Sequence, residues 1–282
     1  MMRWRVGVGA AALGLIGVVS GVALSAGNLS AQGADGPSGP EWRLEGLELS
    51  FCVDFLIELA PAGKRLPKGF QPVAAARFAQ LHPALRSMID AELVYRDWIP
   101  SALCTYGAAV VEVDGRRYGQ SGPGSRQMVG MWAIAGTPEE NGTDSLWVVS
   151  EFLTGNGRIK RAAEGSLLRL REIDEVVGED PESGEDMHGL KIGKTRVTWI
   201  GHLGGDSTRA VAPRHEVWWL KGNRGTTWLA RLSREPVWSQ PMVGGLRVEG
   251  KDDLAKALKS SPIRMLGPAF WGGGATLVFE RQ

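Results

Sequence analysis

The pattern of apolar and polar residues along this chain is mainly that of β-strands. Apolar and polar residues alternate strictly from Leu47 to Asp54, which is the period of a half-buried strand. After Ala102, short apolar runs are separated by glycine-bearing turns, and Asp114-Gly115 is a strong hairpin signal. We expect further strands at 104–113, 127–135, 145–153, 194–203, 214–221, 226–232, 244–249 and 275–280.

Helical patterns are few and short. Pro72 opens one predicted helix that runs to Leu81, and Pro83 opens a second, because proline suits a first helical turn. The second carries an apolar stripe that predicts core positions, formed by Leu85, Met88, Ile89 and Leu93. Asp252-Asp253, followed by two lysines, predicts a third helix. The acidic stretch 172–188 is predicted to be a solvated loop, so the fold class is α+β, mainly β.

The N-terminus has the layout of an export signal. Arg3 and Arg5 precede an apolar run from Val6 to Leu24, and small residues follow. We therefore predict a signal peptide at 1–31, a linker at 32–44, a single domain at 45–282 and export to the periplasm or the medium. The alternative is an uncleaved anchor, in which case this segment would be the chain's contact with the membrane.

Composition excludes one broad class of partner. Lys and Arg total 32 residues against 31 for Asp and Glu, so the chain is close to neutral. Nucleic-acid binding needs a concentrated basic face, and we expect none here. The chain is rich in glycine (39 residues) and tryptophan (11 residues), which agrees with tightly turned β-structure.

Only two cysteines are present, Cys52 and Cys104. In an oxidising compartment an isolated pair predicts a disulfide, and both residues fall in expected strands. Two buried free thiols are the alternative. No histidine lies at zinc-ligand spacing from either cysteine, and His188, His202 and His215 match no local metal motif. We therefore predict no metal site and no cofactor.

Several segments together resemble the acetoacetate decarboxylase-like family. They are an early turn, a central strand with its following turn, and three C-terminal segments: Leu66–Pro72, Trp147–Glu164, Trp218–Gly222, Gly245–Gly250 and Ser261–Trp271. The resemblance covers most of the chain beyond the N-terminal segment. It implies a β-rich cone or barrel with a few short helices and an apolar internal cavity.

Family members that decarboxylate use a buried lysine as a Schiff-base nucleophile in a Gly-aromatic-Pro-Lys-Lys loop. The corresponding stretch here, Gly165–Arg171, contains no lysine. Lys160 is the nearest candidate nucleophile and Glu112 is a candidate acid, although both also fit solvated surface positions. Arg126 is a candidate partner for a ligand carboxylate, with an exposed strand-edge arginine as the alternative.

Tryptophans supply the other ligand-binding candidates. Trp132, Trp147 and Trp219 fall in predicted strands, where they could line a cavity for an apolar or carbonyl-bearing ligand or simply fill the core. Our leading hypothesis is an exported domain that binds a small organic acid or apolar ligand without a Schiff-base lysine. The alternatives are an active decarboxylase or lyase and a lipocalin-like envelope protein without catalysis. The sequence shows no motif for an oligomeric state.

Overall fold

The computed structural model describes residues 42–78, 86, 89–90, 92–113, 115–118, 126–139, 146–164, 169–204, 208–209, 215–222, 227–233, 238–240, 242–266, 269–271 and 275–281. The predicted signal peptide lies outside these residues. The first strand begins at Trp42, inside the expected linker, because Trp42 and Leu44 are buried. None of the helices in the described ranges is long and apolar enough to span a bilayer.

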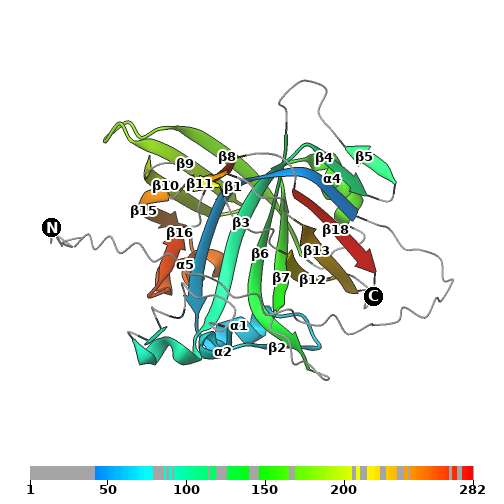
Figure 1. The fold of residues 1–282 in the computed structure, drawn as a ribbon, viewed down its shortest axis with the longest axis horizontal. Coiled ribbons are helices and arrows are strands. Elements are labelled where there is room, and N and C mark those ends of the chain that lie inside the picture. Colours follow the sequence, from blue (N-terminus) through cyan, green and yellow to red (C-terminus); the bar gives the residue numbers. More distant parts are fainter. Residues whose placement is uncertain are drawn as a thin grey trace. The chain divides into compact units, whose positions relative to one another are not determined.

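Strands make up most of the described chain (Figure 1). The strands of the largest sheet are β1 (Trp42–Ile57), β2 (Phe70–Pro72), β3 (Ile99–Ala108), β4 (Val110–Val113), β5 (Arg116–Tyr118), β6 (Gln127–Pro138), β7 (Leu146–Thr154), β8 (Leu170–Glu179), β9 (Asp186–Ile192), β10 (Thr195–Leu203), β12 (His215–Lys221), β13 (Thr227–Ser233), β15 (Met242–Glu249), β16 (Arg264–Leu266) and β18 (Ala275–Arg281). A small second sheet contains β11 (Thr208–Arg209), β14 (Trp238–Gln240) and β17 (Ala269–Trp271). The helices are α1 (Leu59–Arg65), α2 (Ala75–Phe78), α4 (Gly157–Glu164), α5 (Asp253–Ser260) and the 3₁₀ turn η1 (Leu93–Asp97).

Seven strands close into a barrel. Their order is β7-β12-β13-β18-β1-β3-β6, and β6 pairs with β7 to complete the ring. Phe152 on β7 packs edge-on against Trp42 on β1 and Phe279 on β18, with ring centroids 5.7 and 6.5 Å apart. Because these strands are not neighbours of β7, the three rings meet across the barrel interior. The expected mainly β barrel with a few short helices is confirmed.

The other face of β1, β3, β6 and β7 is covered by a second layer. The sheet continues from β7 through β8, β9 and β10 to β15. Phe51 on β1 contacts His188 on β9, with 5.6 Å between ring centroids. Trp132 on β6 pairs in register with Glu151 on β7, the residue preceding the inward-facing Phe152. Trp132 and Glu151 therefore lie on the outer face of the barrel, beneath this layer.

The prediction of a solvated loop at 172–188 is wrong. Residues of β8 pair with β9 from Ile173↔Ile192 to Glu179↔Asp186, and β9 pairs onward with β10. Ile173 is the one fully buried residue of β8, so the sequence of this strand does not show the apolar pattern of a buried strand. Backbone hydrogen bonds to β9 stabilise the hairpin, while most charged side chains of β8 stay in water.

The predicted helices are only partly observed. The helix expected from Pro72 is interrupted, because Pro72 ends β2 and only Ala75–Phe78 is helical. Ile89 is buried as expected, but Leu93 is 64 % exposed in η1, which corrects its assignment to a core stripe. Leu81, Leu85 and Met88 lie outside the described residues. The helix predicted after Asp252 is confirmed as α5, with Asp252 as its N-cap.

The two cysteines are joined by a disulfide. Cys52 and Cys104 are direct register partners on the antiparallel strands β1 and β3, and the bond spans 52 residues of chain. Both lie on the same face of the sheet as Met131, the register partner of Cys104 on β6. The bond therefore links two barrel strands at adjacent positions.

Replacing both cysteines by serine is expected to lower the free energy of unfolding by about 4 kcal/mol, the chain-entropy value for a closed loop of this length. Urea unfolding of the double variant and the wild type measures the difference. Wild-type protein kept under reductant is the control and should match the variant. Identical transitions for the reduced and oxidised wild type would contradict the prediction.

Candidate functional site

Glu151 is a buried carboxylate that is paired with two arginines. Its side chain is 3 % exposed on the outer face of β7. Arg65, the last residue of α1, donates from Nη1 to Glu151 Oε1 over 2.8 Å. Arg171 on β8 approaches Glu151 Oε2 with its Nε at 2.8 Å. Burial raises the pKa of Glu151, and the guanidiniums of Arg171 and Arg65 oppose that rise.

The ion pairs continue from both arginines to the start of α5. Arg171 Nη1 lies 2.8 Å from Asp252 Oδ2, and Arg65 Nη2 pairs with Asp253 Oδ2. The result is an alternating series, Asp253–Arg65–Glu151–Arg171–Asp252, which we call the ion-pair chain. It ties α1, β7, β8 and α5 together through three carboxylates and two guanidiniums of alternating sign.

Asp252 holds one end of the ion-pair chain and also caps a helix. Its Oδ1 accepts hydrogen bonds from the Ala255 amide at 3.0 Å and from the Thr195 hydroxyl. Desolvation opposes ionisation here, but the hydrogen bonds from Ala255 and Thr195 and the charge of Arg171 outweigh it. The pKa of Asp252 is therefore lowered.

Trp132 forms the surface on which Arg65 rests. The Arg65 guanidinium carbon lies 4.9 Å from the centroid of the Trp132 ring, a cation–π contact. Trp132 Nε1 donates to the Ser101 hydroxyl over 2.8 Å, which fixes the orientation of the indole. Arg169 donates to the backbone carbonyl of Arg65 over 3.2 Å. Both ends of Arg65 are thereby held.

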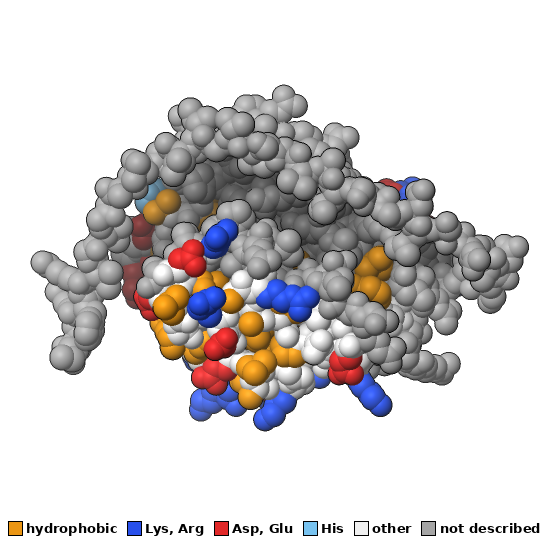
Figure 2. All heavy atoms as spheres, turned by 60° about the horizontal axis from the view of Figure 1, so that its bottom comes forward, with side chains coloured by type: hydrophobic (Ala, Val, Ile, Leu, Met, Phe, Trp, Pro, Cys, Tyr) orange, Lys and Arg blue, Asp and Glu red, His pale blue; other side chains and the backbone are white. Residues whose placement is uncertain are grey.

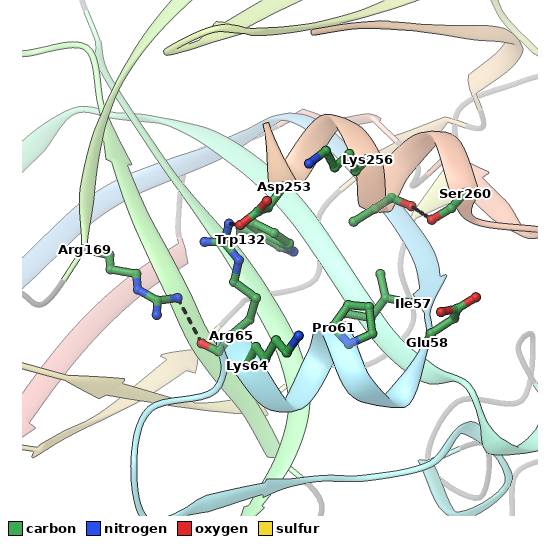
Figure 3. Close-up of a pocket in the computed structure, with 11 residues that line it drawn as sticks. Ile57, Glu58, Pro61, Lys64, Arg65, Trp132, Arg169, Asp253, Lys256 and Ser260 are labelled. Carbon is green, nitrogen blue, oxygen red and sulfur yellow. Dashed lines mark hydrogen bonds and ion pairs between the residues drawn. The ribbon is translucent and has the colours of Figure 1, made fainter. Parts of the chain in front are cut away.

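A pocket of about 540 Å³ opens between α1 and α5, with Trp132 at its back (Figure 3). Apolar atoms come from Ile57, Pro61, Trp132 and Ala257. The charged and polar lining residues are Lys64, Arg65, Arg169, Lys256, Glu58, Asp253 and Ser260. Figure 2, in which the end of the molecule carrying α1 and α2 comes forward, shows basic, acidic and apolar side chains interleaved on this face.

Cations outnumber acids in this pocket, and three of them, Lys64, Lys256 and Arg169, have no acidic partner among the described residues. Four basic residues line it against Glu58 and Asp253. Among the described residues, no carboxylate lies within ion-pair distance of Lys64 or Lys256. Figure 3 shows these two lysines on opposite walls, one from α1 and one from α5. The pocket therefore combines an apolar back wall with a cationic rim, which suits a small organic anion.

The structure does not bring the charged residues singled out in the sequence to this pocket. Lys160 lies on α4, with its Nζ 3.4 Å from Glu172 Oε2. Glu112, on β4, has its Oε2 3.7 Å from Nε of Arg117. Arg126 pairs with Glu48 and donates to the backbone carbonyl of Gly107 over 3.3 Å.

The three candidate tryptophans are also separated. Trp132 lines the pocket. Trp147 is buried on β7, next to β12. Trp219 on β12 packs against Phe70, with ring centroids 5.7 Å apart. Of the ligand-binding residues expected from the sequence, only Trp132 is part of the described pocket.

The sequence interpretation missed Glu151, Arg65, Arg171, Lys64 and Lys256. One signal was available. Glu151 stands in a run of strand residues, Trp147 to Leu153, that are buried on both faces of the sheet. A carboxylate at such a position requires a cationic partner, and the partners come from segments 86 residues earlier and 20 residues later.

The described histidines and acidic residues do not meet the requirements of a metal site. Within the described ranges, no three His, Cys, Asp or Glu side chains gather as metal ligands. His188 pairs with Glu175 of the neighbouring strand, and His202 is exposed. The side chain of His215 lies outside the described residues.

No family model and no curated protein matches the chain. Solved structures do match. The enduracididine biosynthesis enzyme MppR complexed with pyruvate has 12 % identity over 93 % of this chain and 94 % of that one, with a TM-score of 0.40. An acetoacetate decarboxylase-like enzyme from Sphingomonas wittichii RW1 has 10 % identity over 86 % and 89 %, with a TM-score of 0.39. A structure from studies of acetoacetate decarboxylase has 10 % identity over 87 % and 88 %, with a TM-score of 0.42.

The resemblance expected from the sequence thus recurs among solved structures. At these identities and scores, the likeness assigns neither an activity nor site residues to this chain.

Glu151→Gln is expected to lower the free energy of unfolding by about 3 kcal/mol, because two partly buried guanidiniums lose the carboxylate they share and keep only Asp253 and Asp252 as charged partners. The matched control is Glu112→Gln, which removes a half-exposed acid paired with Arg117 and should change stability by less than about 1 kcal/mol. Urea unfolding at pH 7 measures both. Equal effects of the two substitutions would show that the ion-pair chain is not a stabilising centre.

Asp252→Asn is expected to destabilise the protein at neutral pH and progressively less in acid. Asparagine keeps a capping oxygen, so the substitution mainly removes the charge. Because the pKa of Asp252 is lowered on folding, its charge stabilises above the ordinary carboxyl pKa of about 3.9, and this contribution is lost as the pH falls below it. Unfolding measured at pH 7, 5 and 3 checks this. A difference that stays constant to pH 3 or grows in acid would contradict the assignment.

Proposed function

We propose that this chain is an exported domain that binds a small organic acid in the pocket between α1 and α5. The observation that carries the proposal is the combination of a cationic rim with an apolar back wall formed in part by Trp132. Its volume of about 540 Å³ falls within the range usual for small-molecule sites. The proposal of export depends on the sequence before residue 32.

The proposed position differs from the internal cavity expected from the sequence. The pocket lies on the outer side of the barrel strand β6, beneath α1 and α5, whereas Trp42, Phe152 and Phe279 pack together inside the barrel. A ligand carboxylate in the pocket would pair with Lys64, Lys256 or Arg65. Its apolar part would lie against Ile57, Pro61 and Ala257.

The pocket supports binding more directly than Schiff-base chemistry. A lysine nucleophile needs a neutral amine, which proteins obtain by burying the group or placing it beside another cation. Lys64 and Lys256 are exposed, and Lys160 is ion-paired outside the pocket. We therefore propose that the chain holds its ligand without forming a covalent adduct.

Benzoate is expected to bind and benzamide, its neutral isostere, to bind at least tenfold more weakly. Lys64→Met and Lys256→Met should each weaken benzoate binding roughly tenfold, the effect of losing one charge-assisted contact. Lys160→Met is the matched control and should leave binding unchanged. Isothermal titration calorimetry measures all of these affinities. Equal binding of benzoate and benzamide would overturn the proposal.

Borohydride treatment in the presence of acetoacetate tests the catalytic alternative. The proposal predicts no reduced adduct in the intact-protein mass spectrum, since no Schiff base forms. An adduct mapped to Lys64, Lys160 or Lys256 would instead show a lysine that forms a Schiff base and would contradict non-covalent binding.

A further inference from the structure

We propose that Asp253 occupies the position that the ligand's carboxylate takes, so that the protein carries its own competitor for the pocket. This inference rests on the proposed function. It concerns Arg65, the one cation of the pocket that also belongs to the ion-pair chain.

Arg65 presents two different sides to two carboxylates. Its Nη1 meets Glu151 on the barrel wall, and its Nη2 meets Asp253 on α5. Figure 3 shows the Asp253 carboxylate above the Arg65 guanidinium, with Trp132 behind both. Since the Trp132 face supports the guanidinium, the Nη2 edge is an anion position that exists before any ligand arrives.

The two carboxylates differ in how firmly they are held. Glu151 is 3 % exposed and is also bound by Arg171, so it stays in place. Asp253 is 63 % exposed, and Arg65 is the only partner that the described residues give it. Water competes effectively with exposed ion pairs, which is why they contribute little to stability. Asp253 is therefore the carboxylate that can leave.

The helix does not depend on Asp253. Asp252 caps α5 by accepting from the Ala255 amide, and Leu254, Ala255 and Leu258 bury its inner side. Asp253 can consequently turn toward solvent without unwinding the first turn. An incoming carboxylate would then take its place on Arg65 Nη2, so that the guanidinium would keep two carboxylate partners.

This exchange makes the pocket selective for anions over neutral molecules. A carboxylate replaces the charge that Asp253 withdraws from Arg65, whereas a carboxamide cannot. The contact between Asp253 and Arg65 in the unliganded protein also lowers the affinity for the ligand, because every ligand must first displace Asp253 from Arg65.

Asp253→Asn tests the proposal against a matched acid, Glu58. Both acids line the pocket and are exposed, and both substitutions remove one negative charge. Glu58 has no cationic partner in the described part of the chain. We expect Asp253→Asn to tighten benzoate binding at least tenfold and Glu58→Gln less than threefold, as measured by calorimetry on the full mature chain.

The outcomes separate this inference from the proposed function. If benzoate binds the wild type and both substitutions tighten it equally, only the overall charge matters and Asp253 is no competitor. If benzoate binds none of the three proteins, the proposed function itself fails. Asp253→Ser is the second variant should Asp253→Asn misfold, and circular dichroism checks α5 in each. A crystal structure with benzoate must show its carboxylate on Arg65 Nη2; a carboxylate elsewhere, with Asp253 still paired, would overturn the inference.

Discussion

A charge cannot be buried without compensation, and Glu151 shows how this fold provides it. Two guanidiniums, from α1 and from β8, meet its two carboxylate oxygens on the outer side of the barrel wall. Either arginine alone would leave one oxygen of a 3 % exposed carboxylate unpaired. The positions of α1 and β8 against the barrel are therefore coupled through a single side chain, and α5 joins them through Asp252 and Asp253.

The pocket is a consequence of this arrangement. Because Arg65 must reach Glu151 across the face of Trp132, α1 ends beside the barrel, and the buried indole forms the back of the space between the helices. Because Asp252 must reach Arg171, α5 begins on the opposite side of that space. The same electrostatic requirement that stabilises the second layer thus places the cations around an apolar back wall.

Local pattern predicted the strands well and the site poorly, for physical reasons. Alternation marked β1, and short apolar runs between turns marked β6, β7 and β10, because burial of one or both faces leaves a pattern in the sequence. The strand β8 left none, since backbone pairing stabilises it and most of its side chains remain in water. The ion-pair chain joins residues from segments far apart along the sequence, so no short stretch of sequence contains both members of a pair. Trp132, a candidate from the sequence, lines the pocket, whereas Arg65 and Glu151 could be found only from the fold.

The pairing of Cys52 with Cys104 has a consequence for biogenesis. The two residues are register partners on adjacent antiparallel strands, with 4.1 Å between their Cα atoms. A slip of one residue between β1 and β3 would turn one thiol to the opposite face of the sheet. Once β1 and β3 have paired, the bond can therefore form only in this register. Under oxidising conditions, closing this bond would fix the strands of correctly aligned molecules. A molecule with slipped strands would keep two free thiols.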